Sequence, residues 1–151
     1  ASLRVVRTGV EPRRELSALV DPGGSFSIPH LEPGSYRIES RAPGYLPEST
    51  DVRIPHAGEG SGLRVRLRSL RTLALEAHRP LVRRVFATRE LQHTATVRET
   101  QRGAPPDWPG STLEHLSTLV EQTAYAPAEP TPEHVQAIER HANELLQGRD
   151  P

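Results

Sequence analysis

Seven histidines are the residues of this chain best suited to bind a metal ion. His134 and His141 lie seven positions apart, on nearly the same face of a predicted helix but about 10 Å from each other along its axis. One ion cannot join two ligands so far apart unless another segment supplies a third. His30 and His56 each follow a proline at a predicted strand end, and no spacing requires them to meet. We therefore expect no metal site and no cofactor.

The sequence contains none of the common motifs for nucleophilic catalysis or phosphate binding. The chain has no cysteine, which excludes disulfides, thiolate metal sites and a cysteine nucleophile. No serine lies in a Gly-x-Ser-x-Gly turn. The glycine-rich run 58–62 lacks the lysine and the following helix of a phosphate-binding loop. The sequence thus predicts a protein that is not an enzyme.

The strongest surface feature is a row of alternating arginines. Arg64, Arg66 and Arg68 alternate with Leu63, Val65 and Leu67, a pattern typical of a strand with one polar face. The row is either a solvated face paired with acids such as Glu39 and Asp51, or a strip that binds an anion or a protein partner. Nucleic acid is not expected, because the net charge is zero and no aromatic residues stand between the arginines to stack bases.

The arginines belong to a first half with the pattern of a small antiparallel β-sandwich. Short alternating runs recur about every ten residues, with Pro-Gly turns between them. Strands are expected at residues 3–6, 16–20, 25–28, 36–40, near 52–54 and at 63–67. In this register Phe26, Tyr36 and Ile38 should be largely buried.

From about residue 71 the apolar spacing becomes three and four, which predicts a small helical domain of about three helices over residues 71–151. The junction is expected between residues 69 and 79, and a helix is expected from Leu81 to Leu91 with Pro80 near its start. Residues 71–77 either continue the sheet, since Leu73 and Leu75 suit a strand, or begin that helix. Capping boxes are predicted at Thr96/Glu99 and Ser111/Glu114, so Glu114→Ala should cost about 1 kcal/mol or less. A last helix should begin at Thr131-Pro132, end near Gln147 and stop at Gly148.

Charge is divided unevenly within the helical half. Residues 71–102 hold seven arginines against Glu76, Glu90 and Glu99, a net charge of +4. Residues 103–151 hold two arginines against eight acidic residues, a net charge of −6. Helices of opposite charge are natural packing partners, so we expect the two groups to neutralise each other.

The first half resembles the carboxypeptidase regulatory-like domain, a transthyretin-like β-sandwich. The resemblance rests on Gly24-Ser25-Phe26, on the run Leu31-x-Pro33-Gly34-x-Tyr36, and on Gly44-Tyr45. It covers residues 1–70. Members of that family usually open with a further strand, which is missing here and whose place another segment could take; the resemblance therefore implies a truncated domain and an exposed sheet edge.

Residues 71–147 resemble the domain of unknown function that follows the last membrane span of bacterial transglutaminase-like membrane proteins. The shared pattern includes Thr96-x-Arg98-Glu99, then Leu116-x-x-Leu119-x-Glu121-x-x-x-Tyr125, then Pro130-Thr131-x-Glu133. Val97 stands where that family usually has proline. The family implies a setting in the cell envelope and no activity.

Together these observations predict an α+β chain, a fragment of a longer protein, with a β-sandwich at residues 1–70 and a helical domain at 71–151. Its expected function is protein interaction or structural support within a bacterial cell-envelope protein, periplasmic or membrane-associated. Its partner would be another protein or the rest of the parent chain. The fragment itself has no apolar run long enough to enter a membrane. The alternative is an accessory module that binds a glycan or a peptide for a larger enzyme or receptor.

Overall fold

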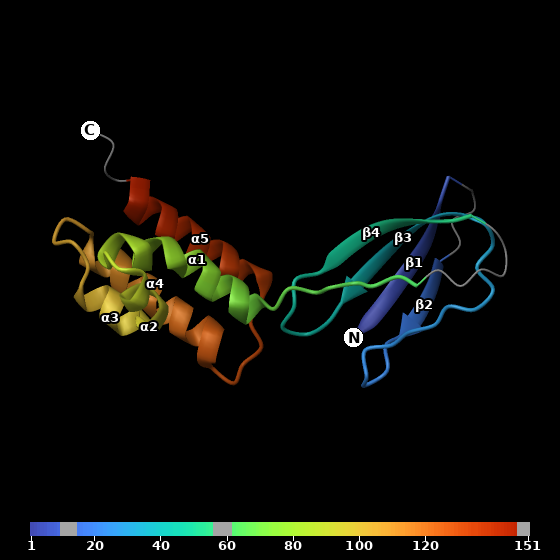
Figure 1. Cartoon of the computed structure of the whole chain (residues 1–151), viewed down its shortest axis with the longest axis horizontal. Coiled ribbons are helices and arrows are strands. Elements are labelled where there is room, and N and C mark those ends of the chain that lie inside the picture. Colours follow the sequence, from blue (N-terminus) through green and yellow to red (C-terminus); the bar gives the residue numbers. More distant parts are fainter. Residues whose placement is uncertain (10–14, 56–61, 148–151) are drawn as a thin grey trace. The chain divides into compact units, whose positions relative to one another are not determined.

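The computed structural model describes residues 1–9, 15–55 and 62–147, and it divides the chain into two compact units. The β unit is Ala1–Leu67 and the helical unit is Arg68–Pro151 (Figure 1). The chain is therefore an α+β protein, as predicted. His56, most of the glycine-rich run and Gly148 lie outside the described residues.

The β unit is built on one antiparallel sheet of four strands in the order β2-β1-β3-β4. The strands are β1 (Ser2–Thr8), β2 (Glu15–Leu19), β3 (Gly34–Arg41) and β4 (Glu48–Ile54). Side chains alternate between the two faces of such a sheet. In register across three strands, Ala18 of β2 pairs with Leu3 of β1, and Val5 of β1 pairs with Ile38 of β3. These residues, with Tyr36, form the core of the unit.

Segments without strand pairing cover the apolar face of this sheet. Val20, Phe26, Ile28 and Leu31 come from the connection after β2, and Leu63 comes from the segment before the helical unit; all pack on the core while partly exposed. The strands predicted at 25–28 and 63–67 are thus wrong, because their side chains are half-buried in alternation but their backbones join no ladder.

The predicted burial is confirmed for two of the three residues named. Tyr36 and Ile38 are each 5% exposed, whereas Phe26 is only half-buried. Phe26 stands in the unpaired covering segment, where one side of the ring stays open to solvent. Tyr36 also donates a hydrogen bond of 2.7 Å from its hydroxyl to the Glu32 carbonyl, and Arg7 binds the Glu32 carboxylate and the Pro33 carbonyl. These contacts hold the Pro33-Gly34 turn against β1.

The helical unit contains three long helices and two short ones among its described residues. They are α1 (Leu70–Val85), α2 (Arg89–Thr94), α3 (Val97–Arg102), α4 (Gly110–Tyr125) and α5 (Pro132–Gln147). Of the two possibilities for residues 71–77, the structure agrees with the helical one, because α1 begins at Leu70 and contains Pro80. The predicted end at Leu91 is wrong, because α1 ends at Val85 and α2 begins at Arg89. Proline removes one backbone donor there, and the buried face formed by Leu70, Ala74, His78 and Leu81 continues through it.

Two of the three predicted helix starts agree with the structure. Thr96 and Glu99 form the capping box at α3, with hydrogen bonds in both directions. Pro132 is the first residue of α5. The predicted capping box at Ser111/Glu114 is wrong. Helix α4 begins at Gly110, so Ser111 already lies inside the helix, and Pro109, which occupies the N-cap position, makes no side-chain hydrogen bond to the helix.

The three long helices pack on one another and bury the larger of the two cores. Leu70, Leu81, Leu116, Ile138 and Val120 are all at most 1% exposed. Trp108, in the connection before α4, is also buried at 6% exposure. The helical unit therefore owes its core to leucine and isoleucine at helical spacing.

Candidate interaction surfaces

The three arginines of the row are exposed in the structure, although the segment that carries them is not a strand. Arg64, Arg66 and Arg68 are exposed, and Leu63, Val65 and Leu67 between them are half-buried. Arg64 and Arg66 belong to the β unit, and Arg68 opens the helical unit. None of the three makes an ion pair or hydrogen bond to another described residue.

The acids named as possible partners of this row are occupied elsewhere. Glu39 accepts a hydrogen bond from Arg4 at 3.3 Å, and Asp51 accepts one from Arg37 at 2.9 Å. Both pairs lie on the outer face of the sheet, where neighbouring strands place the partners beside each other. The proposed neutralisation of the row by Glu39 and Asp51 is therefore wrong.

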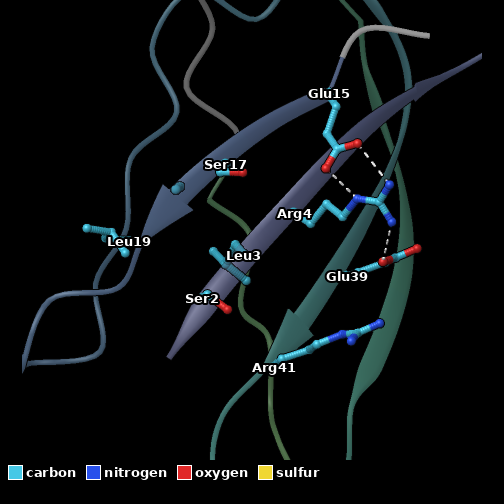
Figure 2. Close-up of a pocket in the computed structure, with 9 residues that line it drawn as sticks. Ser2, Leu3, Arg4, Glu15, Ser17, Leu19, Glu39 and Arg41 are labelled. Carbon is cyan, nitrogen blue, oxygen red and sulfur yellow. Dashed lines mark hydrogen bonds and ion pairs between the residues drawn. The ribbon is translucent and has the colours of Figure 1, made fainter.

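The outer face of the sheet also has a hollow of about 340 Å³ near the ends of β1, β2 and β3. Figure 2 shows Arg4 reaching between Glu15 and Glu39 in its lining. The Arg4 guanidinium binds both oxygens of Glu15, at 2.6 and 2.8 Å. Ser2, Ser17, Leu19 and Arg41 complete the rim, and Leu19 is 87% exposed.

Ion pairing on the sheet fixes the charge state of its residues. The hydrogen bonds from Arg4 and Arg37 hold the pKa values of the Glu15 and Asp51 carboxyls below their usual range. The same bonds raise the pKa values of both guanidinium groups. These groups therefore stay charged at neutral pH, and none is poised to donate or accept a proton.

The histidines do not gather into a metal site. His134 accepts a hydrogen bond from the Thr131 backbone, and His141 contacts Glu144 at 3.1 Å and the ring of His115 at 5.1 Å between centroids. His30 stands in the β unit, apart from these. No cluster of three or more potential ligands that suits a metal ion occurs in the described parts of the chain.

One basic pocket was not predicted from the sequence. Arg79 and Arg83 of α1 and Arg89, Gln92 and His93 of α2 line a pocket of about 410 Å³. The signal was present, because Arg79 and Arg83 are four residues apart and so share a helix face. Beginning the helix at Leu81 concealed it, since Arg79 then stood outside the helix.

Within the described ranges, no helix is both long and apolar enough to cross a bilayer. Searches with family models, against curated proteins and against solved structures found no match for this chain.

Proposed function

We propose that this chain is a non-catalytic interaction module of a bacterial cell-envelope protein. In this proposal Arg64 and Arg66 of the β unit contact an acidic segment of a protein partner or of the parent chain. The observation that carries the proposal is that both arginines are exposed and make no ion pair with any described residue, while Glu39 and Asp51 pair with Arg4 and Arg37.

Electrostatics supports a partner of opposite charge. A guanidinium group is always charged at physiological pH and presents a fork of donors that matches a carboxylate. Two such groups on one exposed segment raise the local concentration of an acidic partner and orient it. The half-buried Leu63 anchors the segment on the core of the β unit, so the arginines project from a surface that is already ordered.

The setting in the cell envelope rests on the resemblance of the two halves to a carboxypeptidase regulatory-like domain and to a domain of transglutaminase-like membrane proteins. In a transthyretin-like sandwich a second sheet would cover the apolar face of the first sheet. Segments 25–28 and 63–67 occupy that position here, without the backbone ladder of a second sheet.

The proposal is tested with a fluorescein-labelled peptide of ten glutamates, whose binding is followed by anisotropy at low salt. The variant Arg64→Glu/Arg66→Glu should lose affinity about tenfold or more, because charge-assisted hydrogen bonds are replaced by repulsion. The matched control compares Arg66→Glu alone with Arg53→Glu, because Arg53 is an exposed arginine of the same unit that does not line the hollow on the sheet. Equal losses of affinity in Arg66→Glu and Arg53→Glu would show that only the net charge matters and would contradict the proposal.

The second candidate function is peptide binding by an accessory module, and the hollow on the sheet favours it. The hollow adjoins β2, an edge strand, and an edge strand can pair with an extended peptide. No aromatic ring lines the hollow, which favours a peptide over a glycan because sugars are commonly bound against aromatic faces.

A thermal-shift panel of short peptides and glycans separates this candidate from the first. A ligand at a hundred times its dissociation constant adds about 2.7 kcal/mol to the stability of the unit that binds it. A peptide bound in the hollow should raise the melting temperature of the wild type and of Arg53→Ala more than that of Arg41→Ala. A shift that is the same in all three proteins would exclude the hollow as its site.

A further inference from the structure

The pocket between α1 and α2 is an independent site in the helical unit. We propose that it binds a phosphate group carrying two or more negative charges, such as a phosphate monoester or a diphosphate. The juxtaposition that points to this ligand is Arg79 and Arg83 from α1 facing Arg89 and His93 from α2 around one cavity of about 410 Å³.

No described carboxylate neutralises the positive charge of this pocket. No carboxylate lines it, and its three arginines make no ion pair with any residue in the described part of the chain. Three acids of the helical unit have contacts elsewhere: Glu121 binds Arg98 at 2.9 Å, Glu99 caps α3, and Glu144 contacts His141. Among the described residues, the ion pair that joins the basic segment 71–102 to the acidic segment 103–151 is at Arg98, and none lies at the pocket.

Hydrogen bonds at the α1–α2 connection position the walls of the pocket. Arg79 and Arg83 are one helical turn apart on α1, so their guanidinium groups extend from the same face. Gln92 on α2 donates a hydrogen bond of 2.7 Å from its side chain to the carbonyl of Phe86, just beyond the end of α1. Thr88 caps the start of α2 by accepting from the Leu91 backbone. Both helices therefore contribute exposed cationic side chains to one pocket.

A phosphate suits this arrangement better than a single carboxylate does. Each guanidinium group offers parallel donors that match two phosphate oxygens, and three of them can surround a group with several acceptor oxygens. One carboxylate would engage one guanidinium and leave the other two close together and uncompensated. The volume also falls in the range of small-molecule sites, which span roughly 300–1,000 Å³.

The test uses the full chain and two probes that carry this chemistry. Inorganic pyrophosphate, titrated calorimetrically, represents a soluble phosphate. Vesicles of phosphatidylcholine with 20 mol% phosphatidic acid, compared with vesicles of pure phosphatidylcholine in a sedimentation assay, represent a lipid headgroup. Arg83→Ala removes a pocket arginine, and Arg84→Ala is the matched control because Arg84 is the next residue of the same helix, is exposed and does not line the pocket.

The expected result is binding of at least one probe, with affinity about tenfold lower in Arg83→Ala and within twofold of the wild type in Arg84→Ala. Binding of pyrophosphate alone identifies a soluble ligand, and binding of the phosphatidic acid vesicles alone identifies a headgroup. Arg89→Ala removes a pocket arginine from α2 and should cause the same loss of affinity, so it tests the proposal independently if Arg83→Ala alters the fold of α1. Binding of neither probe, or equal effects of Arg83→Ala and Arg84→Ala, would overturn the proposal.

Discussion

The β unit and the helical unit use arginine in opposite ways. On the sheet, strand pairing places acids beside Arg4 and Arg37, and both guanidinium groups are bound at 2.6–3.3 Å. In the helical unit Arg98 of α3 pairs with Glu121 of α4 at 2.9 Å, whereas Arg79, Arg83 and Arg89 make no ion pair with any described residue. Antiparallel pairing on the sheet thus places opposite charges side by side, whereas α1 and α2 bring three arginines to one pocket whose lining contains no carboxylate.

The cores of the two units differ as well. Val5 is the one side chain of the β unit among the largest fully buried ones described, and the others, including Leu116 and Ile138, lie in the helical unit. The sheet packs its apolar face against half-buried covering segments, whereas the long helices enclose side chains from all sides. We therefore expect the helical unit to be the more stable of the two.

Leu116→Ala gives the largest expected effect and tests that comparison. Leu116 is fully buried in α4, so truncation removes buried carbon and leaves a cavity, which costs about 2–5 kcal/mol of unfolding free energy. Denaturant unfolding measures the loss, and amide hydrogen exchange should place it in the helical unit. Leu75→Ala, at a 38% exposed position of α1, should cost less than about 1 kcal/mol. Faster exchange throughout the sheet in Leu116→Ala would show that the units unfold together.

His78 gives the helical unit a pH dependence. The ring is buried at 4% exposure, its Nε2 atom has no hydrogen-bond partner among the described residues, and burial lowers its pKa from 6.5 to about 4. As the pH falls from about 6.5 to about 4, the imidazole of His78 therefore binds a proton in the unfolded state but stays neutral in the folded state. Unfolding free energy should drop over that window by up to about 3 kcal/mol, and below it His78 adds no further loss.

Denaturant unfolding of the helical unit at pH 7 and pH 4.5 measures this dependence. In His78→Leu the part of the loss due to His78 should disappear. His93→Gln, which changes an exposed histidine of the same unit, should keep the full dependence of the wild type. If His78→Leu and the wild type lose the same stability on acidification, the imidazole is not held neutral in the core.

The smallest expected effect distinguishes the two predicted capping boxes. Thr96→Ala removes a hydroxyl that accepts from the Glu99 backbone, which should cost about 1 kcal/mol. Glu114→Ala should now cost almost nothing, because its box does not form at the start of α4. Thermal unfolding of the two variants measures the difference in stability. An equal loss of stability in both would indicate that Ser111 and Glu114 do form a capping box.

Alternation of side chains proved a sound guide to burial and a poor guide to hydrogen bonding. It predicted β1 to β4, and Leu3, Val5, Ala18, Tyr36 and Ile38 do face the core, whereas Leu16 and Leu19 of β2 are exposed. Segments 25–28 and 63–67 show the same alternation without any ladder. Half-burial against an existing face produces the pattern by itself, and pairing depends on a neighbouring strand that sequence periodicity does not specify.

Local signals failed where tertiary packing decided the outcome. Pro80 suggested a helix start, yet packing of α1 against α4 and α5 buries Leu70 and Ala74 in front of it and carries the helix through the proline. The spacing of Leu70, Ala74, His78 and Leu81 contained that information. Of the site residues, exposure of Arg64, Arg66 and Arg68 followed from the pattern, whereas the basic pocket required the correct length of α1 and the turn into α2.

We propose that the β unit binds an acidic partner through Arg64 and Arg66, and mapping of backbone amide shifts by NMR locates this binding residue by residue. On titration of the wild-type chain with the ten-glutamate peptide, we predict the largest shifts at residues 63–67. In Arg64→Glu/Arg66→Glu those shifts should vanish. Shifts confined to the helical unit, or shifts at 63–67 that persist in the double variant, would contradict the claim.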